Sequence, residues 1–497
     1  MNSSLTKIEP QHSKSQRSVV WMLLSTCVLL AVVCTGCQSE DSAKSDAVEE
    51  ETPIEVSVPD PLTVLVVDAP ELGPQIKRQW RARRDGELTV LDVTANQWHQ
   101  SDYETEADVV LYSPGLLPNL VDDDRLLPVP DDVWESEEVN HRDILKRSRQ
   151  GVLEYDDQIW ALPLASPQWM LLYRSDLLEQ AKIDVPTTWS EWSLAVDALR
   201  AADFPIAVED RVIIPLAENW GAHAFLLRCA ATIRQRGKLS SVFDRSSMKP
   251  LINQEPFVDA LEDLKETFGD QNGSITPAEA WTRMQSGKCV MTLAWPMNLP
   301  QGDPSPEPES ESEVAEWIST AAVPGSGRWF DLQAGEWIQR EATEDQKVVD
   351  YMGFCGLLGS VSSETRHAAS SFEFLQWLCS QSISSTVLNG SQQSGPFRKS
   401  HLKAASRWSG SQLAPPAAEA MADLIRKAHR NPVALVFPRV PGYHDYLQSL
   451  DKHVRECLAG KSSAAESLES VAIQWETITE RIGRTEQTAN LRRGNGL

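Results

Sequence analysis

The 497-residue sequence predicts an α/β fold with two lobes, and three observations lead to this prediction. Apolar runs of strand length alternate with helical stretches near the start of the folded part, which favours a sheet covered by helices. About 435 residues follow an N-terminal export and linker region, which is more than one hydrophobic core usually holds. The C-terminal part has the residue spacing of amphipathic helices.

The first elements form the pattern of a sheet-and-helix lobe. Residues 62–67 are a β-rich apolar run, which predicts a buried strand, and a helical stretch follows through Trp80. Residues 88–93 and 108–112 predict the second and third strands. We therefore expect a largely parallel sheet. Ligands of such sheets lie at the carboxyl ends of the strands.

The end of the chain predicts two helices. Apolar residues recur at three-and-four spacing in two sets, and Ser463 with Glu466 has the spacing of a capping box at the second helix. The two sets are Leu447, Leu450, Val454 and Leu458, and Leu468, Val471, Trp475, Ile478 and Ile482.

The N-terminus predicts export. Lys14 and Arg17 precede an apolar run over 19–33, which is typical of a signal peptide and short of a membrane span. The small residues before Cys37 resemble the lipobox of bacterial lipoproteins, in which the cysteine is lipidated. We expect a signal peptide over 1–36 and lipid on Cys37, with an uncleaved anchor helix or plain secretion as alternatives. Residues 37–61 predict a disordered acidic linker.

Composition excludes several classes of protein. The net charge of −25 argues against a nucleic-acid partner. Five cysteines remain after the signal and the lipidation site, at spacings that match no zinc site or disulfide framework. We expect buried free thiols, with one disulfide as the alternative, and no metal or cofactor. No nucleophile elbow, phosphate loop or zinc-protease motif is present, so we expect no catalytic residues and no enzyme.

Residues 157–163, 169–178 and 185–192 predict a strand, a second strand and then the start of a helix, where Thr188 and Glu191 form a predicted capping box. These segments most strongly resemble the type 1 extracellular solute-binding proteins, the binding components of ABC importers that include maltose-binding proteins. Further similar segments follow in the family's order, from about 60 to 490 overall. They are 280–295, Val323-Pro324-Gly325, 353–363, 368–375 and 390–401.

The resemblance implies a type II periplasmic-binding-protein-like fold. Its hinge strands would cross near 163–170, 352–360 and 391–398. The first lobe would hold 62–165 plus about 345–392, and the second 166–344 plus about 393–487 with the C-terminal helices. Such a protein would be a lipid-anchored periplasmic monomer that closes on a carbohydrate and delivers it to an ABC permease. A surface sensing or structural lipoprotein and, less favoured, a carbohydrate-active enzyme are the alternatives.

Candidate ligand contacts follow from position in this arrangement. Seventeen tryptophans offer flat apolar faces of the kind that hold sugars, although core packing must account for most of them. The charged candidates could instead be solvated or form structural ion pairs. The candidates are Asp68 and Glu71 after the first strand, Tyr112 and Ser113 after the third, Ser166, Gln168 and Trp169 at the first crossing, Trp220, Trp295 and Trp337 in the second lobe, and Arg398 at the last crossing.

Overall fold

The computed structural model describes residues 60–83, 86–100, 106–234, 241–269, 271, 273–298, 314–340, 348–410, 412–431 and 433–493. The chain divides into two compact units, residues 1–56 and 57–497, and every described residue belongs to the second. The predicted signal peptide, Cys37 and the linker up to residue 59 lie outside the described residues. No helix within the described ranges is long and apolar enough to cross a membrane.

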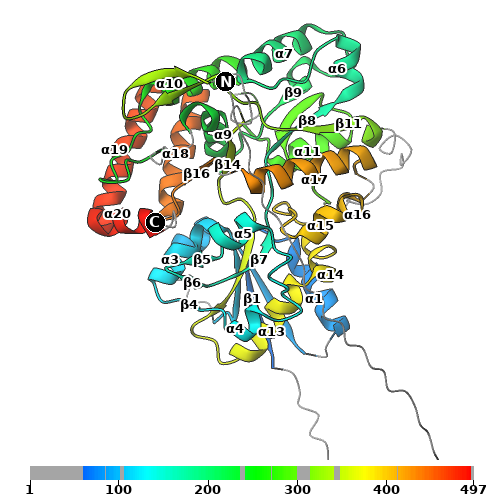
Figure 1. Ribbon diagram of the computed structural model, residues 1–497, viewed down its shortest axis with the longest axis vertical. Coiled ribbons are helices and arrows are strands. Elements are labelled where there is room, and N and C mark those ends of the chain that lie inside the picture. Colours follow the sequence, from blue (N-terminus) through cyan, green and yellow to red (C-terminus); the bar gives the residue numbers. More distant parts are fainter. Residues whose placement is uncertain are drawn as a thin grey trace, which may run out of the picture. The chain divides into compact units, whose positions relative to one another are not determined.

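The first lobe, where Figure 1 labels β1, β4 and β7, contains a six-stranded sheet. Its strand order is β2-β1-β3-β15-β4, with β7 also paired to β15. Strand β1 (Leu62–Val67) pairs in parallel with β2 (Leu88–Val93) and β3 (Val109–Tyr112), which confirms the predicted strands. In contrast, β15 (Leu357–Ser362) runs antiparallel to β3. The expectation of a largely parallel sheet is therefore wrong for this half, because β15 enters from the second lobe rather than through a helical crossover.

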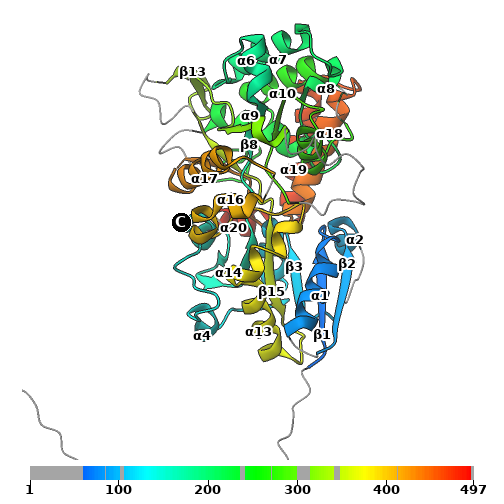
Figure 2. The same cartoon turned by 90° about the vertical axis from the view of Figure 1, so that its right-hand side faces the viewer.

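The helices of the first lobe pack through aromatic rings. Helix α1 (Leu72–Arg83) lies against β2, and α13 (Ala368–Cys379) lies beside β15 (Figure 2). The ring of Trp80 meets Phe374 and Trp377 edge-on at centroid distances of 5.1 and 4.9 Å. The smaller elements of this lobe are α2 (Ala95–Gln100), η1 (Pro114–Leu116), α3 (Leu117–Asp122), β4 (Leu126–Leu127), α4 (Asp131–Trp134), α5 (Lys146–Gly151), β5 (Glu154–Tyr155), β6 (Gln158–Ile159), β7 (Leu162–Ala165), α14 (Gln381–Ser384) and η2 (Leu388–Gly390).

The second lobe contains a four-stranded sheet in the order β11-β8-β10-β9. Its core is continuous with that of the surrounding helices, and Trp192 is almost fully buried. The predicted capping box of Thr188 and Glu191 is present at the start of α7. The elements of this lobe are β8 (Met170–Arg174), α6 (Ser175–Ala181), α7 (Trp189–Ala201), α8 (Val208–Arg211), β9 (Val212–Ile213), α9 (Gly221–Ile233), α10 (Glu255–Phe268), α11 (Pro277–Gln285), β10 (Met291–Ala294), β11 (Ile318–Ala321), β12 (Arg328–Asp331), β13 (Glu336–Gln339) and α17 (Pro415–Arg430).

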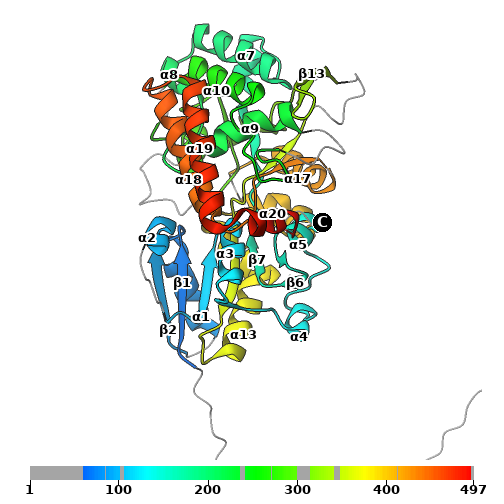
Figure 3. The ribbon, with the colours of Figure 1, turned by 90° about the vertical axis from the view of Figure 1, so that its left-hand side faces the viewer.

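The chain ends in three helices, α18 (Tyr443–Leu458), α19 (Ala464–Ile482) and α20 (Arg484–Arg493). Helices α18 and α19 pack against each other and against α9 and α10, as Figure 3 shows. The Ser463–Glu466 capping box is present, and the predicted apolar faces of both helices are buried or half-buried. Both predicted helices are therefore confirmed.

Three segments connect the lobes and pack tightly together. A Cβ atom on Gly395 would lie 2.2 Å from the backbone nitrogen of Pro167, and one on Gly356, whose φ is +121°, would lie 2.6 Å from the carbonyl oxygen of Ala165. Beside them, β14 (Asp350–Met352) pairs in parallel with β16 (Ala434–Val436). No side chain fits between the crossings, so glycine is required at both positions.

The segment around residue 400 contacts the first lobe. Ser400 donates two hydrogen bonds to Asp143 of the first lobe, from its backbone nitrogen and its hydroxyl. Helices α15 (Lys399–Lys403) and α16 (Ala405–Ser409) follow, and α17 then packs on β11 of the second lobe. At the C-terminus, Arg493 of α20 forms an ion pair with Asp156 in the turn between β5 and β6. The C-terminal helices thus end against the first lobe.

The cysteines at positions 229, 289, 355, 379 and 457 are all free thiols, and only Cys355 is partly exposed. No group of His, Cys, Asp or Glu within the described ranges is arranged to hold a metal ion.

Candidate functional site

A cavity of about 360 Å³ lies between the lobes. The first lobe contributes the loop after β1, the start of α2 and the start of η1, so the carboxyl ends of the strands open into it. The second lobe contributes the first turn of α9 and the first turns of α18. The crossing segments at 354–356 and 392–393 complete the wall.

Three predicted site residues line this cavity: Asp68, Ser113 and Trp220. Asp68 has a φ of +55°, and its carboxylate accepts a hydrogen bond of 3.0 Å from the backbone nitrogen of Ala95. Loss of hydration in the cavity raises the pKa of Asp68, against the lowering effect of that hydrogen bond. The hydroxyl of Ser113 donates to the carbonyl oxygen of Phe354 at 2.8 Å, which joins the first lobe to a crossing segment.

The tryptophans at 169, 220 and 295 form one cluster. Their ring centroids are 4.9 Å apart for Trp169 and Trp295, 5.8 Å for Trp220 and Trp295, and 6.1 Å for Trp169 and Trp220. Trp220 is half-buried, whereas Trp169 and Trp295 are only 3% and 2% exposed. Trp220 thus presents a ring to the cavity, and the other two support it from behind.

Ser166, Gln168 and Trp169 line a separate small cavity of about 40 Å³ at the first crossing. The hydroxyl of Ser166 accepts a hydrogen bond from Ser148 at 3.3 Å. This cavity is roughly the size of one or two waters. The sequence prediction therefore placed these three residues at the hinge, but the structure places them outside the larger cavity.

Glu71 does not line the larger cavity but shapes it. Its carboxylate accepts hydrogen bonds from the hydroxyl of Ser391 at 2.9 Å and from the backbone nitrogen of Gln392 at 2.7 Å. Gln393 donates to the carbonyl oxygen of Asp68 at 2.9 Å. Glu71 thus fixes the third crossing segment, from which Gln392 and Gln393 face the cavity.

Tyr112 and Trp337 also lie away from the cavity. The hydroxyl of Tyr112 is fully buried beside Ser360 at 2.7 Å, and burial raises its pKa. Trp337 lies on the β12–β13 hairpin, where its indole donates to Glu255 at 2.9 Å. The guanidinium of Arg328 covers the ring at 4.0 Å from its centroid. Neither residue is in a position to contact a ligand between the lobes.

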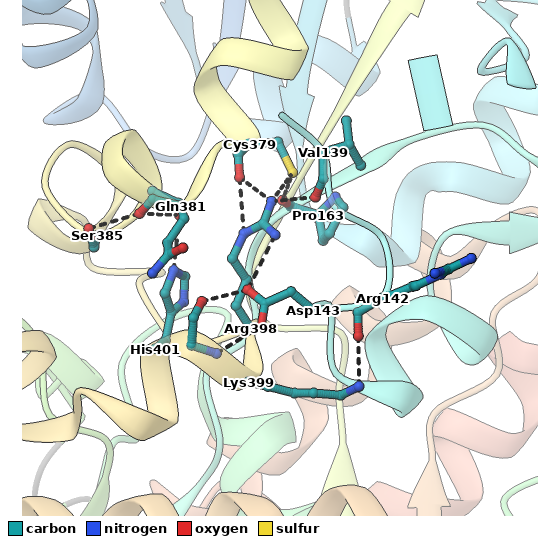
Figure 4. A network of polar contacts seen from close by, with 12 residues as sticks. Val139, Arg142, Asp143, Pro163, Cys379, Gln381, Ser385, Arg398, Lys399 and His401 are labelled. Carbon is teal, nitrogen blue, oxygen red and sulfur yellow. Dashed lines mark hydrogen bonds and ion pairs between the residues drawn. The ribbon is translucent and has the colours of Figure 1, made fainter. Parts of the chain in front are cut away.

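Arg398 is fully buried in a structural network (Figure 4). Its guanidinium donates to the carbonyl oxygen of Cys379 at 3.2 and 2.5 Å and to that of Val139 at 2.9 Å. It also pairs with Asp143 at 3.6 Å. Arg398 does not line the cavity between the lobes. Arg398 instead ties the end of α13 to the 139–143 segment.

Sequence reasoning missed the polar side chains that α9 and α18 contribute. His223 bonds through Nδ1 to the hydroxyl of Tyr351 at 2.8 Å, and burial lowers its pKa to about 4, so the ring is neutral. Asp451 caps α9 by accepting from the backbone nitrogens of Asn219 and Ala222, each at 3.0 Å. The periodicity of α18 indicated only its apolar face. The Pro441-Gly442 turn before that helix was the available signal.

Hydrogen bonds already join the lobes across the cavity. Asn96 of the first lobe accepts from His444 at 2.8 Å and from Gln448 at 3.2 Å, both on α18. The ring of Tyr443 packs so closely on Gly115 that a Cβ atom there would lie 2.2 Å from the ring. The structure therefore has its lobes in contact beside the cavity.

The lining of the cavity has a distinct charge. Three carboxylates line it, those of Asp68, Glu218 and Asp451, and no lysine or arginine of the described chain does. The remaining polar groups are amides, hydroxyls and imidazoles, which pair with hydroxyl groups of a ligand as donors or acceptors. Such a lining suits a neutral or cationic polar molecule and disfavours an anion.

The arrangement of two α/β lobes, three crossing segments and a cavity between them defines the type II periplasmic-binding-protein fold. Solved structures of this class agree. MalE3 from T. maritima with maltose bound has a TM-score of 0.63 at 16% identity, covering 84% of this chain and all of that one. A solute-binding protein from Agrobacterium radiobacter K84 in complex with ribitol has a TM-score of 0.64 at 16% identity, covering 84% and 98%.

The GacH receptor of Streptomyces glaucescens, solved unliganded and with acarbose, has a TM-score of 0.59 at 14% identity, covering 84% and 98%. Comparison with curated protein sequences gives no match. Residues 85–330 match the family model of the bacterial extracellular solute-binding proteins. Over these residues, the match confirms the resemblance to the extracellular solute-binding proteins that the sequence predicted.

Proposed function

We propose that this protein is the solute-binding receptor of an ABC importer and that it captures a carbohydrate or polyol in the cavity between its lobes. One observation carries the proposal: both lobes line this cavity, with the ring of Trp220 beside amide and hydroxyl groups and without a basic side chain. An aromatic face stacks on the apolar face of a sugar, and the polar groups pair with its hydroxyls. Ligands of similar proteins, namely maltose, ribitol and acarbose, belong to this chemical class.

Capture would work by hinge closure. A ligand favours the closed form only through contacts that need both lobes. Asp68 and Ser113 on one side and Trp220 on the other could supply them. The Asn96–His444 bond would then form alongside the ligand contacts. A buried hydroxyl or amide without a hydrogen-bond partner costs free energy. The polar lining would therefore favour a solute whose hydroxyl groups pair with it.

We further propose that lipid on Cys37 holds the protein to a membrane of the cell envelope, in the periplasm, near its permease. Multiple acyl chains anchor a protein stably, whereas one chain does not. A Cys37→Ala variant should fold and bind solute but leave the membrane fraction. Retention of that variant in the membrane fraction would favour an uncleaved anchor helix instead.

Calorimetry across a panel of mono- and oligosaccharides and polyols tests the receptor function. At least one neutral solute should bind and raise the unfolding midpoint, because a ligand of the native state stabilises it by mass action. Trp220→Ala should weaken that solute by about tenfold to a hundredfold, since a stacked, desolvated aromatic ring is worth about 1.5–3 kcal/mol.

Trp317→Ala is the matched control, because Trp317 is 46% exposed and does not line the cavity. It should bind the solute as the unmodified protein does. Equal effects of both substitutions would contradict a ligand site at Trp220. If no neutral solute binds at all, the sensing or structural lipoprotein becomes the better account.

A further inference from the structure

A second cavity, of about 540 Å³, shares no lining residue with the first. Its walls come from α5 and the β5–β6 turn of the first lobe, the end of α9 and residues 241–245 of the second, the strand β16, and the last turn of α20. Its volume falls within the range of small-molecule sites.

The charge of this cavity is opposite to that of the protein. The chain has 71 acidic and 46 basic residues, yet the basic residues outnumber the acidic ones here. Of the three acids in the lining, Asp156 is paired with Arg493 at 3.6 Å. The basic residues are Lys146, Arg147, Arg234, Arg245, Arg430 and Arg493.

Two arginines, one from each lobe, are held at fixed positions by the same strand segment. Arg147 of α5 donates to the carbonyl oxygen of Asn431 at 2.6 Å, and Arg234 at the end of α9 donates to that of Ala434 at 2.9 Å. The other terminal nitrogen of Arg147 is buried without a hydrogen-bond partner in the described structure. The bonded nitrogen also forms an ion pair with the carboxylate of Asp350 at 3.8 Å.

Arg245 adds a third guanidinium to the lining of this cavity. Its Nε atom is buried without a partner in the described part of the chain. The carboxylate of the preceding Asp244 instead accepts hydrogen bonds from Ser246 and Ser247. Burial and, after it, the charge of Arg245 lower the pKa of Arg234. Like charges thus face one another in a partly desolvated space, which an anion would relieve.

We propose that this cavity is a binding site for a small multivalent oxyanion, one that carries phosphate or several carboxylate groups. Guanidinium groups match the planar oxygen pairs of these anions bidentately. The anion would contact Arg147 of the first lobe together with Arg234, Arg245 and Arg430 of the second. It would therefore join the two lobes at a place separate from the solute cavity. The site is independent of the solute proposed above, because the two cavities are separate and opposite in charge.

Titration of the full-length protein with inorganic pyrophosphate, at constant ionic strength set by sodium chloride, tests the site. Saturable binding is expected in calorimetry, with a rise in the unfolding midpoint. Arg245→Gln and, separately, the exposed Arg430→Gln should each weaken it by about tenfold, since one charge-assisted hydrogen bond contributes about that factor.

Arg366→Gln is the matched control, because Arg366 is exposed and lies outside this cavity. It removes the same charge and should leave pyrophosphate binding unchanged. The absence of saturable binding would overturn the proposal, as would equal weakening by all three substitutions. A parallel arm uses vesicles of phosphatidylglycerol: binding to vesicles but not to pyrophosphate would replace the small-anion site by a membrane-facing surface.

Discussion

Replacing Arg398 separates a structural role from a ligand contact. The Arg398→Met substitution keeps much of the volume of the side chain but removes the guanidinium. Two carbonyl oxygens, of Cys379 and Val139, would lose their donor, and Asp143 would lose its cation. All of these groups lie in the interior network of Figure 4.

The expected loss follows from these contacts. Each buried acceptor left unpaired costs about 1–3 kcal/mol, and breaking a buried ion pair by removing one partner costs about 3–5 kcal/mol in total. Because Arg398 is fully buried and the side chain of Asp143 is only 16% exposed, we expect the free energy of unfolding of the first lobe to fall by about 3–5 kcal/mol.

Urea unfolding followed by tryptophan fluorescence measures this loss, and calorimetry with the bound solute measures affinity. Affinity for the solute should change less than about twofold in the folded variant, a free-energy change of about 0.4 kcal/mol. The double variant Arg398→Met/Asp143→Asn should recover part of the stability, because the second substitution removes the uncompensated charge. Unchanged stability together with a large loss of affinity would refute this reasoning and restore Arg398 as a ligand contact.

Three further outcomes are expected. Gly395→Val should destabilise the protein by more than about 3 kcal/mol, because its Cβ would overlap Pro167, and a small loss in urea unfolding would contradict the tight crossing. Burial lowers the pKa of His401 from 6.5 to about 3 in the folded protein. As the pH drops from 6.5 toward 3, His401 therefore becomes protonated in the unfolded chain before it does so in the folded protein. The free energy of unfolding should fall over this range. In urea unfolding at pH 7 and pH 5, the His401→Gln variant should lose less stability between the two pH values than the unmodified protein. An equal loss in both proteins would contradict this role of His401. Asn96→Ala removes the acceptor of His444, so solution scattering without ligand should report a larger radius of gyration than for the unmodified protein.

Local patterns predicted the elements, because their causes lie within a few residues. The strand at 62–67 can be recognised from its own apolar residues alone. The capping boxes of Thr188 and Ser463 each depend on a glutamate only three residues further along the chain. In contrast, the direction of β15 depends on where the chain re-enters the lobe, some 245 residues after β3. No local pattern carries that information.

The site was predicted in part for the same reason. The rule that ligands bind at the carboxyl ends of strands found Asp68 and Ser113. It could not find Asn96, His444 or Gln448, because these side chains meet only when α2 and α18 are brought together from opposite lobes. For Arg398 the sequence could not separate the two roles, because a charged residue near a crossing has the same sequence signature whether it faces a ligand or a carboxylate of the protein.

Glu71 shows how the rule can hold through an indirect contact. Glu71 follows the first strand, at the carboxyl end where ligands of such sheets bind. Its carboxylate nevertheless accepts hydrogen bonds from Ser391 and Gln392 instead of lining the cavity. Those bonds, with that from Gln393 to the backbone of Asp68, hold a segment more than three hundred residues away against the strand end. The segment then presents two amide side chains to the space between the lobes. The first strand-to-helix loop therefore acts in two ways, supplying the carboxylate of Asp68 directly and positioning the amides of Gln392 and Gln393 through Glu71.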